Sequence, residues 1–444
     1  MHPTQVQRPV AAHSAAPQRL LAAIVALAIA LAFAPAQAAG PAAQPPPEAP
    51  SGAQAFAHVQ HLAGVIGPRP AGTPAERQAA DYLAATLRQH GYPVEMHAFP
   101  FPFFEARRVD VQVAGATPRT LAAQALFLSA ATPPGGVEAD VVVAGLGRPE
   151  DYEGRRADGA IVLVERGMIT FREKVTHAAA RGAAAVVVYN NQPGLVAGTL
   201  GQRSEIPAVI VSQDDGRALV EAVQRGGLRL RLVVDAVHET RTAANVVATR
   251  RGATQPDAIV VVGAHFDSVP GSPGANDNAS GVAAVLEAAR VLADAPLART
   301  VQFVLFSAEE LGLHGSAAFV SERRAGVMAM VNLDMVGWGD RLMAGNGSGR
   351  DDGPVGAALE VGRRLGIEIT RFRATASDHT SFERAGVPAV FLHRGVDPHH
   401  HRPTDVPANI APGHLEEAGR LVAALVQELA GARSARRPPA RVRG

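Results

Sequence analysis

Histidine and acidic residues follow several apolar segments of the chain, each just beyond the point where the segment ends. They are His265 and Asp267 after residues 259–262, Glu309 and Glu310 after 301–306, Asp334 after 328–333, and His401 beyond 389–392. Imidazole and carboxylate groups bind zinc without help from thiolates, and the chain contains no cysteine. These residue types therefore predict a metal centre made of histidine and acidic side chains.

A further acid, Asp277, lies in the Gly- and Asn-rich turn 274–280, just before a segment with helical spacing. Taken singly, each residue has an ordinary alternative: Asp277 could cap a helix, Glu309 and Glu310 could complement a helix dipole, and the others could be polar residues of the core or of a turn. Gathered at one place, however, these carboxylates repel one another unless cations neutralise them. A pair of divalent ions removes that conflict and can polarise a peptide carbonyl.

The elements that must position these residues alternate between strands and helices. The segments 259–262, 301–306, 328–333 and 389–392 are apolar on both faces, as buried central strands are. Residues 280–292 follow the first of them with helical spacing. This alternation predicts an α/β fold with a mostly parallel, mixed sheet sandwiched by helices. Such sheets bind ligands beyond the carboxyl ends of their strands, where the ionisable residues lie.

Composition limits the classes of protein that the chain can belong to. Its 444 residues are 47% hydrophobic and 19% charged, which allows a large core and excludes wholesale disorder. Lys and Arg number 42 against 41 Asp and Glu, so no bulk basic field exists and no nucleic-acid partner is expected. The absence of cysteine excludes disulfides, thiolate zinc sites and cysteine nucleophiles.

The two ends of the chain are predicted to lie outside the fold. Residues 1–39 indicate a signal peptide, because Arg8 and Arg19 precede the apolar run 20–34 and small residues follow at 36–38. That run is shorter than the roughly 20 residues of a spanning helix, although an uncleaved anchor or a buried helix is the alternative. Residues 40–52 predict a Pro-rich linker, and 433–444 an Arg-rich disordered tail. We expect a secreted or periplasmic protein without stable membrane insertion after signal removal.

Residues 119–238 have a different character from the flanking regions. Short β-branched runs at 141–143, 161–164, 186–189 and 209–211 alternate with helical stretches at 171–181 and 215–224. The region could be more of the same α/β domain. Its residues nevertheless resemble a protease-associated domain, in the stretch 159–167, Phe171, Lys174, the turn 181–183 and Ile206-Pro207. The resemblance implies an inserted β-rich domain without catalytic residues, which divides the catalytic domain into 53–118 and 239–432.

The motifs around the predicted metal centre also resemble one family as a set. The set consists of His265-x-Asp267, Asp277-Asn-Ala-Ser-Gly281, Glu309-Glu310, Asp334 and His401-Arg-Pro403-Thr-Asp405. It resembles the secreted di-zinc aminopeptidases of bacteria, whose relatives include the vacuolar aminopeptidases and glutamate carboxypeptidase. The resemblance covers nearly all of residues 53–430 and implies a zinc exopeptidase-like fold and two Zn²⁺ ions per chain.

Position by position, the resemblance implies which residues bind each metal ion. Asp277 bridges the two ions, Glu310 and His401 complete one of them, and His265 and Asp334 complete the other. The spacing His-x-Pro-x-Asp selects His401, rather than its two preceding histidines, as the ligand. Zinc is favoured over cobalt or manganese by these ligand types.

The resemblance also implies two residues that act without binding metal. Asp267 matches an acid that orients a metal-binding imidazole, and Glu309 matches the general base. Several of these aminopeptidases carry a tyrosine immediately before the final histidine, where it stabilises the tetrahedral oxyanion. This chain has His400 at that position.

The function implied is an exported di-zinc metallo-aminopeptidase. It hydrolyses the N-terminal peptide bond of peptides with a metal-bound hydroxide and with Glu309 as the base. A carboxypeptidase or dipeptidase with the same metal site is the alternative, because the ligands do not read the amine or the carboxylate of a substrate. A catalytically inactive, receptor-like binding protein is a third possibility, although such proteins lose metal ligands. Peptides are the expected partners, and the motifs carry no information on oligomeric state.

Overall fold

The computed structural model describes residues 49–115, 118–196, 198–350, 353–374 and 377–431. The predicted signal peptide at 1–39 and the Arg-rich tail at 433–444 lie outside the described residues, as does most of the predicted linker. None of the helices in the described ranges is long and apolar enough to span a membrane.

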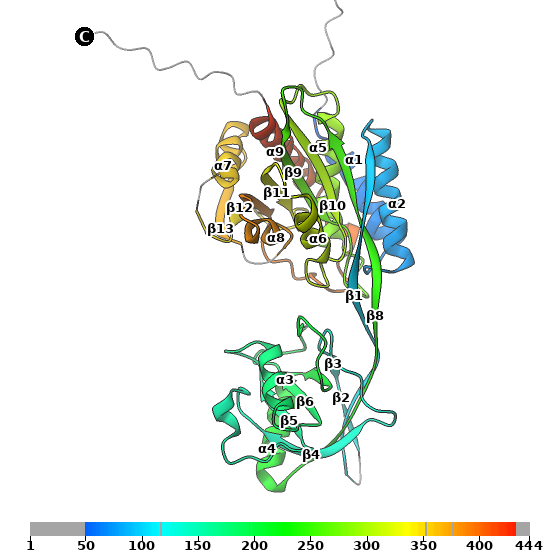
Figure 1. Ribbon diagram of the computed structural model, residues 1–444, viewed down its shortest axis with the longest axis vertical. Helices are drawn as coiled ribbons and strands as arrows, with labels where there is room; N and C mark the ends of the chain where they lie inside the picture. The colour runs from blue at the N-terminus through cyan, green and yellow to red at the C-terminus, as the bar shows by residue number, and fades with distance from the viewer. Residues whose placement is uncertain (1–48, 116–117, 197, 351–352, 375–376, 432–444) are drawn as a thin grey trace, which may run out of the picture. The chain divides into compact units, whose positions relative to one another are not determined.

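The α/β part of the chain is built from elements on both sides of the inserted region (Figure 1). Before the insert these are α1 (Gly52–Val59), η1 (Gln60–Ile66), α2 (Pro74–Gln89) and β1 (Val94–Val113). After it they are β8 (Arg229–Arg250), β9 (Gln255–His265), η3 (Ala275–Ser280), α5 (Gly281–Leu292), β10 (Arg299–Phe306), α6 (His314–Arg323), β11 (Val327–Leu333), β12 (Leu342–Asn346), α7 (Gly353–Leu365), β13 (Ile369–Arg373), α8 (His379–Arg384), β14 (Ala389–His393), η4 (Pro407–Asn409) and α9 (Pro412–Ala430).

The sheet of this part has the order β13-β12-β14-β11-β9-β10-β8, with β1 paired to β8. Its central strands β14, β11, β9 and β10 are parallel neighbours, whereas β12 joins β14 and β8 joins β10 in antiparallel pairs. These central strands contain the segments that the sequence predicts as buried strands, and the predicted mixed α/β fold is confirmed. Because the central strands are parallel, their carboxyl ends lie at one edge of the sheet.

Both faces of the sheet are covered, which explains why its central strands are apolar on both sides. In β9, Val260 and Val262 pack into one core with α1, α2, α5 and α9, while Val261 packs into the core on the opposite face. That second core contains Phe319 of α6 and Phe382 of α8. Buried on both sides, the strands hold their carboxyl-terminal residues in defined positions.

The inserted region has its own strands, helices and cores. Its elements are β2 (Arg119–Leu121), β3 (Ala123–Ala125), β4 (Val137–Val143), η2 (Pro149–Tyr152), β5 (Ile161–Glu165), α3 (Phe171–Ala179), β6 (Ala185–Tyr189), β7 (Ala208–Val211) and α4 (Gln213–Gly226). Strands β4 to β7 pair in parallel, and β3 is antiparallel to β7. Apolar residues pack on both faces of these strands. The strands and helices that the sequence predicts in this region are present.

The long strands β1 and β8 were not predicted from the sequence. They pair antiparallel from Val94 opposite Ala248 to Val113 opposite Leu230, and the far end of β8 also pairs with β4 of the insert. Two prolines, Pro100 and Pro102, interrupt the sequence pattern of β1, and proline within a segment argues against a strand. The continuous pairing therefore depends on the partner strand, which is far away in the sequence.

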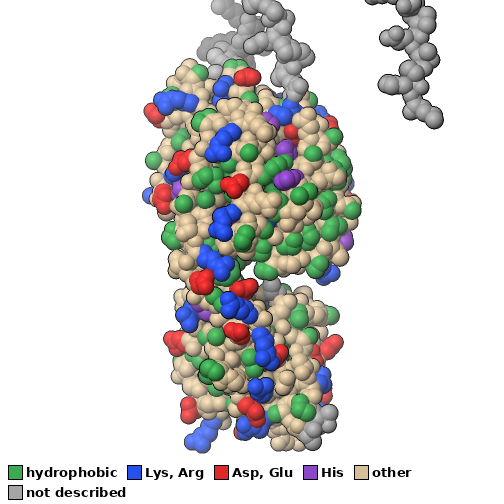
Figure 2. Space-filling model, turned by 90° about the vertical axis from the view of Figure 1, so that its right-hand side faces the viewer, with side chains coloured by type: hydrophobic (Ala, Val, Ile, Leu, Met, Phe, Trp, Pro, Cys, Tyr) green, Lys and Arg blue, Asp and Glu red, His purple; other side chains and the backbone are tan. Residues whose placement is uncertain are grey.

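The surface carries charges of both signs. On the face that Figure 2 shows, the Lys and Arg side chains are interspersed with those of Asp and Glu. This mixture agrees with the near balance of 42 basic and 41 acidic residues in the whole chain. Charges of one sign do not gather into a single field on this face.

Candidate metal centre

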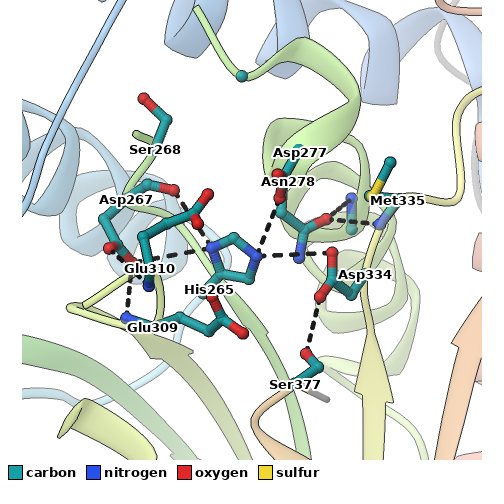
Figure 3. A network of polar contacts seen from close by, with 12 residues as sticks. His265, Asp267, Ser268, Asp277, Asn278, Glu309, Glu310, Asp334, Met335 and Ser377 are labelled. Carbon is teal, nitrogen blue, oxygen red and sulfur yellow. Dashed lines mark hydrogen bonds and ion pairs between the residues drawn. The ribbon is translucent and has the colours of Figure 1, made fainter. Parts of the chain in front are cut away.

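The structure brings the sequence-predicted site residues together at the carboxyl edge of the sheet. His265 is the last residue of β9, Asp334 follows β11, and Glu309 and Glu310 follow β10, while Asp277 lies in η3 before α5. Figure 3 shows His265 between Asp277 and Asp334 on one side and Asp267, Glu309 and Glu310 on the other. The remaining predicted ligand, His401, comes from the loop after β14.

Asp277 lies at the centre of this arrangement. Its Oδ1 atom is 3.2 Å from Nε2 of His265, and its Oδ2 atom is 3.1 Å from Nε2 of His401. The side chain is buried, with 4% of the residue exposed. The two oxygens of one carboxylate thus face two different imidazoles. The peptide bond between Asp277 and Asn278 is cis.

Each of these imidazoles also faces a second acid. Nε2 of His265 is 3.5 Å from Oδ1 of Asp334, and Nε2 of His401 is 3.1 Å from Oε2 of Glu310. Zinc ligands about 2.0–2.1 Å from a tetrahedral ion lie about 3.3 Å from one another, close to these separations. The donor atoms of His265, Asp277 and Asp334 lie close enough together for one metal position. His401 links the same Asp277 carboxylate to Glu310.

Unsatisfied oxygens show that these residues fit divalent cations. In the described part of the chain, the buried atoms Oε1 of Glu310 and Oδ1 of Asp334 have no hydrogen-bond partner. A buried carboxylate oxygen without a partner is costly, and buried charges in proteins are usually paired or coordinate metals. Histidine and carboxylate donors suit zinc in particular.

Burial and charge repulsion among the carboxylates also indicate a site for cations. Burial raises the pKa of Glu309 well above its usual range, and although His265 opposes this rise, the carboxylates of Glu310, Asp378 and Asp334 add to it. Burial also raises the pKa of Glu310, to about 7, with the charge of Asp277 as a further cause. Divalent cations among these groups reverse that effect, because they favour the ionised carboxylates.

Asp267 contacts the backbone of the loop that carries the two glutamates. Its Oδ1 accepts a hydrogen bond from the Glu309 amide at 3.1 Å, and its Oδ2 accepts one from the Glu310 amide at 3.3 Å. Its Oδ1 is 3.7 Å from Nδ1 of His265, whereas its backbone carbonyl lies 3.2 Å from that nitrogen. The resemblance implies that Asp267 orients a metal-binding imidazole. In the structure its carboxylate lies beside His265 and also positions both glutamates.

The loop of Asp277 is tied to the loop of Asp334 through Asn278. The Asn278 side chain accepts hydrogen bonds from the amides of Gly281 and Met335 and donates one to the carbonyl of Leu333 (Figure 3). Ser377 donates a hydrogen bond to Oδ2 of Asp334 at 2.7 Å, which leaves Oδ1 facing His265. Ser377, which is not among the predicted site residues, thus contributes a contact behind one predicted ligand.

Two buried acids that the sequence analysis gave no role fasten the histidine loop to Asp277. Asp405 accepts hydrogen bonds from the amides of Asn276 and Asp277, at 2.8 and 3.1 Å. Asp397 accepts one from the Asn276 side chain and one from the His399 amide. Asp405 belongs to the motif His401-Arg-Pro403-Thr-Asp405, so its spacing from His401 could have identified it from the sequence. Nothing local in the sequence marked Asp397.

Arg69 is another residue that was not predicted from the sequence. It is fully buried, and its guanidinium donates hydrogen bonds to the carbonyls of Gly67, Phe266, Pro273 and Gly274. Burial lowers its pKa to about 10, against the opposing effect of nearby acids, so it stays protonated at neutral pH. Three of its acceptors lie in the loop between His265 and Asp277, which Arg69 therefore braces.

A second brace comes from Glu76 of α2. This helix begins after Thr73, whose side chain accepts a hydrogen bond from the Glu76 amide. The Glu76 carboxyl is buried and accepts a hydrogen bond from the hydroxyl of Ser307 at 2.8 Å. Ser307 directly follows β10 and leads into the loop of Glu309. Burial raises the pKa of Glu76 to about 7, although the bond from Ser307 lowers it.

This pKa predicts how stability depends on pH. Between about pH 4.5 and about pH 7 the folded state keeps the Glu76 proton that the unfolded chain releases. The stability that this proton contributes is full below pH 4.5 and is lost as the pH rises through about 7. As the pH rises from about 5 to about 8, the wild type loses this contribution and Glu76→Gln does not. We therefore expect the free energy of unfolding of Glu76→Gln to rise relative to that of the wild type by up to about 3 kcal/mol across this range.

Chemical denaturation of the wild type and of Glu76→Gln at about pH 5 and at about pH 8 measures this difference in stability. The metal centre is common to both proteins, so its own pH dependence largely cancels. Glu221→Gln on α4 is the control, because the Glu221 side chain is 66% exposed and is expected to show no such change. Equal pH dependence of Glu76→Gln and wild type would contradict a buried, protonated Glu76.

Comparison with known proteins gives two family matches within the chain. Residues 245–426 match Peptidase family M28, and residues 137–219 match the PA domain. The second match lies within the region 119–238, in which the sequence predicts an inserted protease-associated domain, and the presence of that domain is confirmed.

Related proteins cover most of the chain. Aminopeptidase YwaD of Bacillus subtilis (strain 168) is 34% identical over 396 residues, which are 84% of this chain and 84% of that protein. Among solved structures, an aminopeptidase from Aneurinibacillus sp. strain AM-1 has a TM-score of 0.79 at 31% identity and covers 86% of this chain and 94% of its own. BSAP, a zinc aminopeptidase from Bacillus subtilis, has a TM-score of 0.76 at 32% identity, with 86% and 96% covered.

Proposed function

The chain belongs to peptidase family M28, and from this premise and the geometry of the metal centre we propose that it is an exported aminopeptidase with two zinc ions. The family membership makes it a metallopeptidase, a hydrolase of peptide bonds, as the sequence analysis predicted. One observation supports the proposed pair of ions above others: the two oxygens of the buried Asp277 carboxylate face His265 and His401 separately.

The proposed ligands follow from these contacts. His265 and Asp334 hold one ion, Glu310 and His401 hold the other, and Asp277 binds both. The related structure described as a zinc aminopeptidase supports zinc as the metal. When bound, the ions polarise a peptide carbonyl and make a water molecule acidic at neutral pH.

The residues of the chain then move the proton. Glu309 is adjacent to the ligand Glu310 and is not needed as a ligand itself, so its carboxylate is available to accept a proton from the attacking water. The same carboxyl group then donates that proton to the nitrogen of the leaving amine. Asp267 positions this base, because it holds the amides of Glu309 and Glu310.

The aminopeptidase assignment rests on the relatives rather than on the ligands. YwaD and the two solved structures are all named aminopeptidases. A carboxypeptidase or dipeptidase can use the same metal-binding residues, since the selection of a free amine or a free carboxylate depends on other groups of the pocket. Recognition of a free amine therefore has to be measured.

We expect the enzyme to cleave aminoacyl-anilides and to lose essentially all of this activity when the substrate amine is acetylated. Removal of metal with a chelator is expected to abolish cleavage, and zinc is expected to restore it. Dipeptides and peptides with an amidated carboxyl terminus serve as the comparison substrates. Undiminished cleavage of the acetylated substrate excludes an aminopeptidase, and a need for a free carboxylate indicates a carboxypeptidase.

The same preparation tests the inactive, receptor-like alternative. Such a protein would bind peptides without cleaving any substrate of the panel, with zinc present in excess. The predicted donor groups and Glu309 all converge at the site, and this argues for a catalyst instead.

Export is proposed from the sequence pattern of residues 1–39. The prediction places the mature chain in the periplasm or outside the cell. The mass of the protein recovered after export tests it, because an intact N-terminus is incompatible with a cleaved signal peptide.

A further inference from the structure

Two consecutive histidines of the loop 397–405 direct their rings at the same carboxylate oxygen. Oδ2 of Asp277 is 3.1 Å from Nε2 of His401 and 3.2 Å from Nε2 of His400. The two ring centroids are 3.8 Å apart. The donor atoms of Asp277, His400 and His401 thus lie close enough together to hold one metal ion.

The backbone conformation of the loop makes this arrangement possible. In an extended chain, consecutive side chains point to opposite sides, so two neighbours cannot normally face one atom. His401 has a φ of 59°, in the left-handed region that non-glycine residues rarely adopt. This conformation lets both rings lie on the same side of the loop. It is locally unfavourable, and such conformations persist where surrounding contacts enforce them.

The enforcing contacts are the hydrogen bonds of the two buried acids of the loop. Asp397 binds the Asn276 side chain, and Asp405 binds the amides of Asn276 and Asp277. Asp397 is 5% exposed and Asp405 is 1% exposed. The loop is therefore held at both ends against the segment that carries Asp277, and His400 and His401 lie between these two fastening points.

We propose that His400 is an additional ligand of the metal ion held by Glu310 and His401. This inference rests on the proposed metal centre and adds a donor to it. That metal position then has two imidazoles and two carboxylates, from His400, His401, Glu310 and Asp277. The other position has one imidazole, from His265, and the carboxylates of Asp334 and Asp277. Borderline ions such as Zn²⁺ and Co²⁺ favour imidazole, so the first position binds its ion more tightly.

Coordination through Nε2 would leave only Nδ1 of His400 with a proton, so the nitrogen that faces Asp277 could not also donate to an oxyanion. Tyrosine precedes the final histidine in several of the aminopeptidases that the sequence resembles, where it stabilises the oxyanion. An imidazole replaces it in that role only if its nitrogen donates a hydrogen bond, whereas a nitrogen that binds metal has no proton to donate. The contact between Nε2 of His400 and Oδ2 of Asp277 has the spacing of neighbouring ligands, which favours coordination.

The test measures metal binding rather than turnover. Metal-free wild type, His400→Ala and His400→Tyr are titrated with Co²⁺ and, in competition with a chelator, with Zn²⁺. We expect the two histidine variants to bind one of the two ions at least about tenfold more weakly, since even indirect partners of metal ligands commonly contribute that much. The visible absorption of the tighter Co²⁺ site is expected to change, because its donor set changes.

A matched control comes from the same loop. His399 contacts the hydroxyl of Thr404, with Nδ1 3.0 Å from Oγ1, and His399→Ala is expected to leave both affinities unchanged. His401→Ala is expected to lose the same ion as His400→Ala, and to lose it more completely. Thermal unfolding of the metal-free proteins shows whether each variant is folded.

The outcomes separate this inference from the proposed function. Suppose that the wild type binds two ions and cleaves peptides, and that His400→Ala has the wild-type affinities and Co²⁺ spectrum. His400 is then not a ligand. A loss of turnover in this variant would then indicate that His400 contacts the substrate. If wild type binds no ion, the proposed function itself fails. A selective loss of affinity for one ion together with a changed Co²⁺ spectrum in both His400 variants supports His400 as a ligand, whereas a loss of affinity with the wild-type spectrum shows that it only contacts Asp277.

Discussion

Replacement of Glu309 with glutamine is expected to lower kcat by about 10³-fold while both metal ions stay bound. Glutamine has nearly the same size and can occupy the same space, but it cannot accept a proton from water or return it to a leaving amine. Because Glu309 is not among the proposed ligands, the number of zinc ions per chain and their affinities are expected to remain those of the wild type. Turnover of an aminoacyl-anilide and metal quantification on one preparation measure both effects.

The adjacent Glu310 provides the matched control. Glu310→Gln changes the same chemical group in the same loop, but its carboxylate lies 3.1 Å from Nε2 of His401 and is a proposed ligand. We expect this variant to lose affinity for one ion together with activity. If Glu309→Gln retains near-normal turnover, Glu309 is not the base. If Glu309→Gln loses metal as Glu310→Gln does, the two roles have been assigned wrongly.

Replacement of Arg69 with methionine is expected to destabilise the folded protein by about 3–5 kcal/mol. Methionine retains most of the apolar length of the side chain but leaves the carbonyls of Phe266, Pro273 and Gly274 without their donor in a buried place. Buried polar groups without partners carry their full desolvation cost. These carbonyls lie between the proposed metal ligands His265 and Asp277, so the affinity for zinc is expected to fall as well.

Chemical denaturation of the metal-loaded and metal-free proteins measures the effect of Arg69→Met. Arg323→Met is the control, because Arg323 pairs with Glu95 at the surface, where the two side chains are 29% and 57% exposed. Surface ion pairs contribute about 1 kcal/mol or less, so this variant is expected to lose little stability and no zinc affinity. Equal effects of the two substitutions would show that water satisfies the carbonyls near Arg69.

The predictions from sequence were most complete where the signal is local. Strand β9 reads as a continuous apolar run because both of its faces are buried, and His265 follows that run directly. The same pattern recurs at β10 with Glu309 and Glu310 and at β11 with Asp334. An apolar run and an ionisable residue just after it are visible in a few consecutive letters, so neither needs knowledge of the rest of the fold.

Contacts between distant segments were not visible in that way. Strand β1 contains prolines and is stabilised by β8, which begins more than a hundred residues later. Arg69 and Glu76 lie far from the motifs in the sequence, and their partners are backbone carbonyls and a serine hydroxyl, which leave no mark in the sequence. Which carbonyls lack donors is decided only when the loops have packed.

Sequence was therefore sufficient to predict which ionisable groups the structure brings together and the sheet edge at which they meet, because residue type and hydrophobic pattern are local properties. In the sequence, the neighbouring residues His399, His400 and His401 could be distinguished only by the spacing of the motif His-x-Pro-x-Asp. Folding places His400 and His401 against Asp277 and turns His399 towards Thr404. The direction of a side chain depends on backbone angles that distant contacts impose, here those of Asp397 and Asp405 with the loop of Asp277.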